Sequence, residues 1–409
     1  MTAPPHSEQP PTGQSQRSAT AALSRLLGDT GVEDFATAYW GRRPHRSSIG
    51  AVDDLFSSAA VDELISVRGL RAPFLRVAKD GRTFGDRQFT SGGGVGAAVA
   101  DQVNDDLIWR HFEAGATLVL QGLHRTWEPI LRFTQELAAD LGHPCQVNAY
   151  ITPPQSTGFS DHYDVHDVFV IQIEGEKRWR IREPVWPVPL RDQPWDQHKD
   201  AVEAASDQEP LDEFVLRPGD VLYLPRGFLH SATALGDFSI HLTIGVHQWT
   251  RHHLAEELLT GALRLAAADE GMRHSLPLGV DVGDASGLVA DLAAARAALV
   301  AAVEQVPDDV IARALGGRAR NAQRTGPLAP LAQLQAVRSG TGRVELRSHL
   351  RPRLVHDPLR LVTRLGQVDL DEADESDVTK LLETGGPMTL SVGLAERLLR
   401  AGVCIPSSL

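Results

Sequence analysis

Two short stretches far apart in the sequence carry the residues best suited to metal chemistry. His162-Tyr163-Asp164 lies within the segment Asn148 to Arg182, and residues i and i+2 of a strand project from the same face. The imidazole of His162 and the carboxylate of Asp164 would therefore lie side by side, about 6–7 Å apart at the backbone. Such a pair supplies two ligands of a 2-His-1-carboxylate site, which holds Fe(II) and leaves one octahedral face open.

A third ligand is expected in the segment Leu216 to Ala232, which reads LRPGDVLYLPRGFLHSA. Arg-Pro-Gly-Asp marks a turn, Val221 to Leu224 a short strand, and a second turn from Pro225 to Gly227 leads to His230. In a barrel of antiparallel strands, this histidine can meet the upstream pair across the interior. The residues alone predict a metal site inside a β-barrel; the alternative is a buried, hydrogen-bonded polar cluster without a metal.

The residues after the upstream pair set its surroundings. His166 shares the face of His162 but would lie about 13 Å from it along a strand, too far for joint coordination, so we expect a surface or supporting role. Val168 to Trp179 is apolar and β-branched and predicts a strand, with a turn at Gly175.

Both segments resemble the Jumonji-C (JmjC) branch of the cupin superfamily, and in particular its ribosomal-oxygenase group of 2-oxoglutarate-dependent protein hydroxylases. The resemblance rests on TPP, GF, HYD and FVIQIEGEKRWR in the first segment, PRGFLH in the second, and FATAYWGRRP near the start of the chain. It implies an α+β fold in which a double-stranded β-helix (cupin/JmjC jelly-roll) barrel is followed by a helical dimerisation region and a C-terminal winged-helix-like domain.

The resemblance also implies roles for single residues. Fe(II) would be held by His162, Asp164 and His230. Lys177 would bind the far carboxylate of 2-oxoglutarate, which is physically sensible because a buried carboxylate without a partner is costly; the alternative is a solvated lysine in a hairpin turn. The cosubstrate pocket would be lined by Asn148, Tyr150 and His241, for which ordinary core or hydrogen-bonding roles are the alternative.

The activity implied is hydroxylation of a protein side chain, using Fe(II), 2-oxoglutarate and O2. The substrate would be a histidine or arginine of a ribosomal protein. Other readings remain open: a 2-oxoglutarate oxygenase acting on a small molecule or as an N-methyl-lysine demethylase, a non-oxidative metal-binding cupin, or a non-enzymatic protein-binding scaffold. The polar insert Pro184 to Glu213 separates the ligand segments, and its Trp186 and Trp195 either face the substrate or pack on the loop.

Four segments are expected along the chain. Residues 1–20, rich in Pro, Ser, Thr and Gln, would be a disordered tail, and 21–250 the catalytic domain. Ala/Leu-rich helices with 3.6-residue periodicity fill 251–342, which the resemblance makes a dimerisation domain; an intramolecular bundle is the alternative. Residues 343–409 would be the winged-helix-like domain. They hold nine Lys/Arg against ten Asp/Glu, so we expect no direct nucleic-acid binding.

Composition limits the partners and the compartment. The 409 residues carry a net charge of −13. This charge does not suggest a surface that binds anionic membranes, and it would suit a basic protein partner. No apolar run is expected to approach the ~18 residues of a membrane span, so no membrane association is predicted. Two scattered cysteines exclude a disulfide framework. A reduced, cytoplasmic enzyme fits these features.

Overall fold

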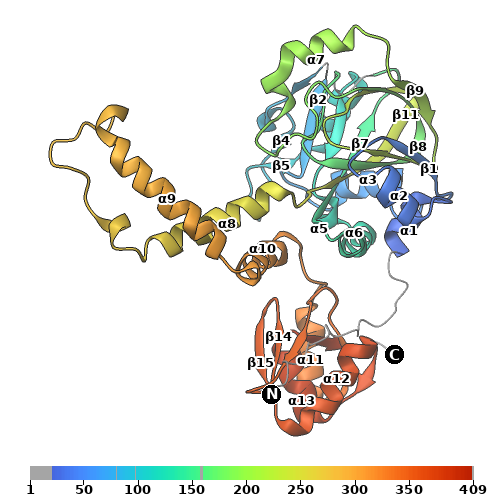
Figure 1. Cartoon of the computed structure of the whole chain (residues 1–409). Helices are drawn as coiled ribbons and strands as arrows, with labels where there is room; N and C mark the ends of the chain where they lie inside the picture. The colour runs from blue at the N-terminus through green and yellow to red at the C-terminus, as the bar shows by residue number, and fades with distance from the viewer. Residues whose placement is uncertain (1–20, 80, 97, 157–159, 408–409) are drawn as a thin grey trace. The chain divides into compact units, whose positions relative to one another are not determined.

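The computed structural model describes residues 21–407 except 80, 97 and 157–159, so the predicted disordered tail lies outside the described residues. The chain divides into two compact units. One unit combines Met1–Val246 with Arg324–Leu409, and the other is His247–Gln323. The first unit contains the barrel, and each part is described here by itself (Figure 1).

The barrel is built from one antiparallel sheet that has nine strands among the described residues. Its path runs β1-β10-β8-β11-β7-β6-β2-β3, and β9 pairs with β8. The strands are β1 (His45–Ser48), β2 (Leu75–Lys79), β3 (Arg82–Thr83), β6 (Thr117–Leu120), β7 (Cys145–Thr152), β8 (Asp167–Arg182), β9 (Asp212–Leu216), β10 (Asp220–Leu224) and β11 (Leu229–Val246). The two segments that carry the candidate ligands thus come together where β8 pairs with β11, as the predicted jelly-roll barrel requires.

The helices of the barrel region pack outside the sheet. Their bounds are α1 (Ala21–Leu27), α2 (Val32–Ala38), α3 (Ser58–Asp62), a π-helical turn at Glu63–Val67, α4 (Asp105–Glu113), α5 (Leu123–Thr126), α6 (Glu128–Leu141) and α7 (Lys199–Ser206). The α6 helix buries Ile130, Phe133 and Leu137, which recur at helical spacing, and α1 packs against it. A small pair of strands, β4 (Thr90–Ser91) and β5 (Gln102–Val103), completes the region.

Alternation along β7 separates the core from the barrel interior. Val147, Ala149 and Ile151 are buried in the hydrophobic core, whereas Asn148 and Tyr150 are only partly buried and border cavities. This is the period-two pattern of a strand whose two faces meet different surroundings. The register of β7 therefore decides which polar side chains reach the interior of the barrel.

Gly175 does not form the turn that the sequence predicted. β8 runs without interruption from Asp167 to Arg182, and Gly175 has a φ of +67° where the register with β11 shifts. A Cβ atom on Gly175 would lie 2.2 Å from the carbonyl oxygen of Phe238, so glycine is needed for an irregularity within a continuous strand. Lys177 consequently lies in the strand and is buried, not in an exposed turn.

The unit His247–Gln323 is helical and keeps much apolar surface exposed. It contains α8 (Arg251–Ala266), α9 (Val289–Gln305) and α10 (Asp308–Ala322), whose shared core includes Ala262, Ala266, Ala302 and Val306. Ala285–Gln305 is long and apolar enough, by length and composition, to cross a membrane, and little of it is buried. The expectation that no apolar run reaches this length is therefore wrong, although one such helix is weak support for a membrane span.

Residues 324–407 enclose a core of their own. The elements are α11 (Pro330–Ser339), β12 (Arg343–Leu346), β13 (Arg353–Val355), β14 (Arg360–Thr363), β15 (Gly366–Asp369), α12 (Glu375–Thr384), β16 (Met388–Thr389), α13 (Val392–Arg400) and β17 (Cys404–Pro406). Helix α11 belongs to this core, because Ala336 is buried in it and the Gln333 amide donates to the carbonyls of Leu399 and Cys404. The winged-helix-like assignment and the four segment boundaries stay predictions.

Candidate metal centre and cosubstrate pocket

A short antiparallel bridge brings the two ligand segments together. His162 and Asp164 lie in the segment just before β8, not within a strand as the sequence suggested. The His162 N–H donates to the carbonyl of His230 (3.2 Å), the His230 N–H donates back (2.9 Å), and the Gly227 N–H donates to the Asp164 carbonyl (3.1 Å). These backbone bonds fix the spacing of the ligands without using their side chains.

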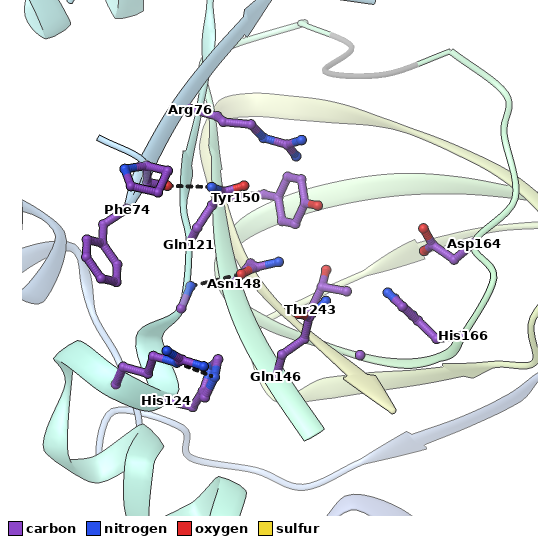
Figure 2. Close-up of a pocket in the computed structure, with 14 residues that line it drawn as sticks. Phe74, Arg76, Gln121, His124, Gln146, Asn148, Tyr150, Asp164, His166 and Thr243 are labelled. Atoms are coloured by element: carbon purple, nitrogen blue, oxygen red, sulfur yellow. Dashed lines mark hydrogen bonds between the residues drawn. The ribbon is translucent and has the colours of Figure 1, made fainter. Parts of the chain in front are cut away.

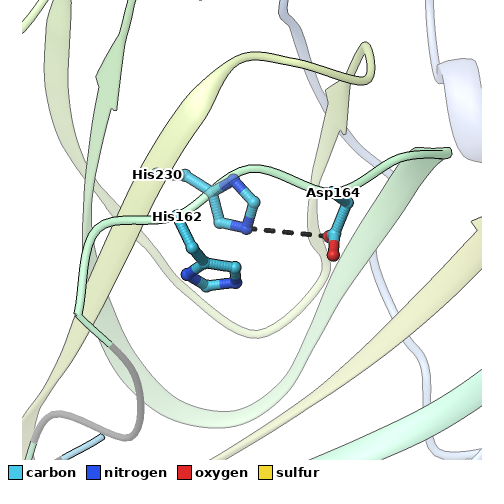
Figure 3. A group of neighbouring side chains, drawn as sticks. All are labelled: His162, Asp164 and His230. Atoms are coloured by element: carbon cyan, nitrogen blue, oxygen red, sulfur yellow. Dashed lines mark ion pairs between the residues drawn. The ribbon is translucent and has the colours of Figure 1, made fainter. Parts of the chain in front are cut away.

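The three predicted ligands face one another at this bridge. Their ligand atoms all lie within 4.8 Å of each other, and Nε2 of His230 is 3.8 Å from Oδ2 of Asp164 (Figure 3). Two imidazoles and one carboxylate on one side of an ion leave the opposite side open to other ligands. The arrangement suits Fe(II) and related divalent cations.

Hydrogen bonds orient both histidines for coordination through the same atom. Nδ1 of His162 lies 2.8 Å from the Ser160 carbonyl oxygen, and Nδ1 of His230 lies 3.2 Å from that of Phe228. Because a carbonyl oxygen can only accept, each Nδ1 must carry the proton. Each Nε2 therefore presents a lone pair toward the centre, which is the orientation that metal-ligating histidines acquire from such partners.

The electrostatics favour the protonation states that a metal needs. Burial, with the neighbouring His162, lowers the pKa of His230 to about 4, so its imidazole is neutral at pH 7. For Asp164, burial acts to raise the pKa, but the surrounding imidazoles and Arg76 outweigh it and hold the pKa below the usual range. The neutral imidazole of His230 and the ionised carboxylate of Asp164 can bind a divalent ion without first losing protons.

A small cavity beside the triad contains a buried cation. This cavity, of about 70 Å³, is lined by Lys177, Tyr150, His241 and Trp179 together with the three metal-ligand candidates. Nζ of Lys177 lies 3.1 Å from Oγ1 of Thr152 and 3.5 Å from Nδ1 of His241. Burial lowers the pKa of Lys177 to about 7, and none of the ion pairs found among the described residues includes it. A guest with a carboxylate would supply the missing partner, so the site fits a dicarboxylate that also reaches the metal.

His241 lies beside Lys177 and not in the ligand cluster. Its ring stacks on Tyr150 with centroids 5.0 Å apart and meets Trp179 edge-on at 5.6 Å. Burial, followed by the nearby Lys177 charge, holds the pKa of His241 well below its usual range. A neutral imidazole next to the buried ammonium adds no competing charge to the pocket.

Strand register divides the interior between the small cavity and a larger one. Tyr150 pairs with His241, and two residues along the same strands Asn148 pairs with Thr243. Tyr150 and Thr243 border both cavities, whereas Asn148 borders only the larger one, where its Oδ1 accepts the Gly122 N–H (3.0 Å). The predicted role of Asn148 in cosubstrate binding stays a prediction.

His166 lines the larger cavity next to Asp164 (Figure 2). It packs against Gly245, where a Cβ atom would lie 2.9 Å from Cε1 of the imidazole. Arg76 and Gln121 line the same cavity, and sequence reasoning missed both. No motif surrounds them, and strand pairing through β2 and β6 is what brings them to the site.

The insert anchors the ligand segment from outside. Tyr163, between the two upstream ligands, is 1% exposed and donates from its hydroxyl to the Gln193 carbonyl (3.0 Å). Trp186 stacks on His198 with centroids 4.5 Å apart, and Trp195 packs against the cluster around Tyr163. Neither tryptophan lines the two cavities at the triad.

A buried carboxylate joins the beginning of β8 to β10. Asp167 begins β8 and accepts hydrogen bonds from the Tyr223 hydroxyl and from the Arg226 N–H (2.9 Å), and the Tyr223 oxygen accepts the Gly41 N–H (2.7 Å). Burial raises the pKa of Asp167 although both of its donors favour the charged form. This network ties the segment after Asp164 to the turn that leads to His230.

Comparisons with known proteins agree with this geometry. The family described as JmjC domain matches residues 119–254. Ribosomal oxygenase 1 of Gallus gallus is 30% identical over 272 residues, which cover 64% of this chain and 43% of that protein. The bifunctional lysine-specific demethylase and histidyl-hydroxylase NO66 of Aedes aegypti is 28% identical over 263 residues, covering 62% and 39%. The chain spans less than half the length of these curated relatives.

Solved structures show the same fold. YcfD, a ribosomal oxygenase from Escherichia coli, in complex with cobalt and 2-oxoglutarate, has a TM-score of 0.52 at 17% identity and covers 92% of this chain and 98% of its own. Residues 119–254 therefore match a JmjC domain, and the chain has the fold of these solved structures. Over 64% of its length it is similar to a ribosomal oxygenase.

Proposed function

We propose that this protein is an Fe(II)- and 2-oxoglutarate-dependent protein hydroxylase. The observation that carries the proposal is the close placement of a 2-His-1-carboxylate cluster and a buried lysine that lacks an acidic partner among the described residues. A metal alone would explain the cluster but not the cation. A cosubstrate with two carboxyl groups accounts for both.

Different residues would have different roles in the proposed reaction. His162, Asp164 and His230 would hold the iron, which when bound with 2-oxoglutarate supplies the oxidising chemistry that uses O2. Lys177 and the Thr152 hydroxyl would bind the far carboxylate and so orient the keto acid toward the metal. The buried walls formed by Trp179 and the neighbouring strands exclude water from this step.

For the substrate we propose a histidine or arginine side chain of a ribosomal protein. The printed names of the relatives, ribosomal oxygenase and histidyl-hydroxylase, support this choice. The net charge of −13 suits a basic partner. We also propose a homodimer, assembled through the helical unit, and a cytoplasmic location.

Anaerobic reconstitution of the full chain tests the proposed activity. Fe(II) followed by 2-oxoglutarate should produce the weak visible charge-transfer band of the chelate, and succinate should form once O2 is admitted. Asp164→Ala and His162→Ala should each abolish succinate formation while the circular-dichroism spectrum stays native, because each removes one ligand from the triad.

Two outcomes would contradict parts of the proposed function. Succinate formation retained in both variants would refute the triad. Metal binding without 2-oxoglutarate binding would show that Lys177 does not receive a carboxylate, and a non-oxidative metal-binding cupin would then be the better description.

A further inference from the structure

A buried ion pair lies next to the upstream ligand segment. Asp161 directly precedes His162, and Arg182 is the last residue of β8. Nε of Arg182 lies 3.7 Å from Oδ2 of Asp161, and the two side chains are only 10% and 11% exposed. Neither residue lines the cosubstrate cavity or the larger cavity at the triad. The pair is therefore placed to act on the metal site through its neighbours and not by direct contact.

Asp161 lies between a candidate ligand and the group that orients it. Nδ1 of His162 is 2.8 Å from the carbonyl oxygen of Ser160, so the residues on both sides of Asp161 make this contact. A displacement of Asp161 would move the Ser160 carbonyl relative to the imidazole. The Nδ1–H group would then lose its acceptor, and the Nε2 lone pair would no longer be directed toward the metal.

Arg182 connects the ligand segments to the insert. Its backbone pairs with that of Leu229, which directly precedes His230. Its Nη2 donates to the carbonyl of Ser206 (2.7 Å), the last residue of α7 in the insert. The last carbonyls of a helix lack partners within the helix, so a cation is favourable at this end. One guanidinium thus holds the end of α7 and faces the residue before His162.

Charge, and not a direct hydrogen bond, holds the pair together. A separation of 3.7 Å is longer than a hydrogen bond. Nε and Nη1 of Arg182 and Oδ1 of Asp161 are buried without a hydrogen-bond partner among the described residues. Removal of one charge would leave the other buried and uncompensated, which is strongly destabilising, whereas removal of both charges is often tolerated.

We propose, building on the proposed hydroxylase and its metal site, that Arg182 is a positioning residue for the ligand His162. The guanidinium attracts the Asp161 carboxylate and so keeps the Ser160 carbonyl where it accepts from the imidazole. Loss of a group that orients a metal-ligating histidine typically weakens metal binding by about 10–100-fold. Loss of this ion pair should have an effect of that size although every ligand remains.

The double variant Asp161→Asn/Arg182→Met separates positioning from stability. It removes both charges and keeps side chains of similar size, so the metal-free full chain should unfold at nearly the same denaturant concentration as the wild type. The Kd for Co(II), used in place of Fe(II), should nevertheless rise about 10–100-fold. The visible absorption of bound Co(II), which depends on its coordination geometry, should also change.

The single variants show whether the two residues act through one contact. Asp161→Asn and Arg182→Met should each raise the Co(II) Kd about as much as the double variant, because each breaks the same ion pair. Both should also unfold at a lower denaturant concentration, because each leaves one buried charge.

Arg178→Met is the matched control. Arg178 also lies on β8 and pairs with Glu213 of the insert at 3.6 Å, but that ion pair is exposed. Its loss should leave the Co(II) Kd and the absorption spectrum unchanged.

Wild-type Co(II) affinity and absorption in the double variant would overturn the inference. So would an equal loss of affinity in Arg178→Met, or losses in the two single variants that add up in the double variant. Failure of the proposed hydroxylase is a different result. The variants would then still differ in Co(II) binding as described, while the wild-type chain with Fe(II), 2-oxoglutarate and O2 formed no succinate.

Discussion

At the scale of single residues, Lys177 links burial to cosubstrate binding. Its pKa is lowered to about 7 by burial alone, and a bound carboxylate would raise that pKa again. Binding therefore favours the protonated lysine. The Kd for 2-oxoglutarate should be constant below pH 7 and then rise by up to about tenfold per pH unit as the free protein loses the proton.

Isothermal titration of 2-oxoglutarate into the full chain loaded with a redox-inert metal measures this dependence. Lys177→Met retains the length and apolar character of the side chain but cannot be charged, so it should bind weakly and lose the rise above pH 7. The same steep dependence in Lys177→Met would assign the titration to another group.

The sequence was sufficient to predict that the three candidate ligands meet, but not which residues surround them. Short motifs that can be recognised without a structure contain His162, Asp164 and His230. In the structure their ligand atoms lie within 4.8 Å of one another. A continuous strand would put His166 about 13 Å from His162, but the segment before β8 is irregular, and His166 lines the larger cavity. Arg76 lies far upstream and reaches the site only through strand pairing, which no local motif encodes.

At the scale of elements, the Asp167–Tyr223 hydrogen bond joins the beginning of β8 to β10. Tyr223→Phe should lower the free energy of unfolding by about 1.5–3 kcal/mol, because it removes a hydrogen bond to a buried carboxylate. It should also weaken metal binding, since Asp167 also holds the Arg226 N–H in the turn that leads to His230. Denaturant unfolding and metal titration measure the two effects.

Tyr39→Phe serves as the control for this prediction. Tyr39 belongs to the same aromatic cluster, stacking on Phe35 with centroids 6.3 Å apart, and no side-chain hydrogen bond of its hydroxyl is found among the described residues. It should change neither stability nor metal affinity appreciably. Equal effects of the two substitutions would mean that the hydroxyl of Tyr223 has no special part in holding the ligand segments.

Element boundaries were predictable where periodicity alone determines them. The amphipathic spacing of apolar residues from Trp127 to Leu141 predicts a helix, and the structure forms α6 over Glu128–Leu141. The strand expected from Val221 to Leu224 lies within β10. Gly175 shows where local signals fail. A glycine with positive φ serves a hairpin turn and a strand irregularity equally well, and the close approach of the Phe238 carbonyl from β11 decides between them.

At the scale of the whole molecule, the helical unit His247–Gln323 has more apolar surface than its own core uses. Leu259 and Leu263, one turn apart on α8, are 53% and 56% exposed. Neighbouring exposed apolar side chains of this kind mark a contact with a partner or a membrane. The Ala/Leu periodicity predicted these helices from the sequence, but periodicity cannot specify what covers a face.

The proposed homodimer makes a definite prediction for this surface. The double variant Leu259→Glu/Leu263→Glu should raise the dimer Kd at least about hundredfold, because each leucine buried contributes about 1.5–3 kcal/mol. Light scattering across a concentration series measures the change, with helicity checked by circular dichroism. Arg264→Glu, next along α8 on a different face, should leave the dimer intact. A wild-type chain that stays monomeric at micromolar concentration, or that floats with lipid vesicles through Ala285–Gln305, would show that these apolar faces serve a different partner.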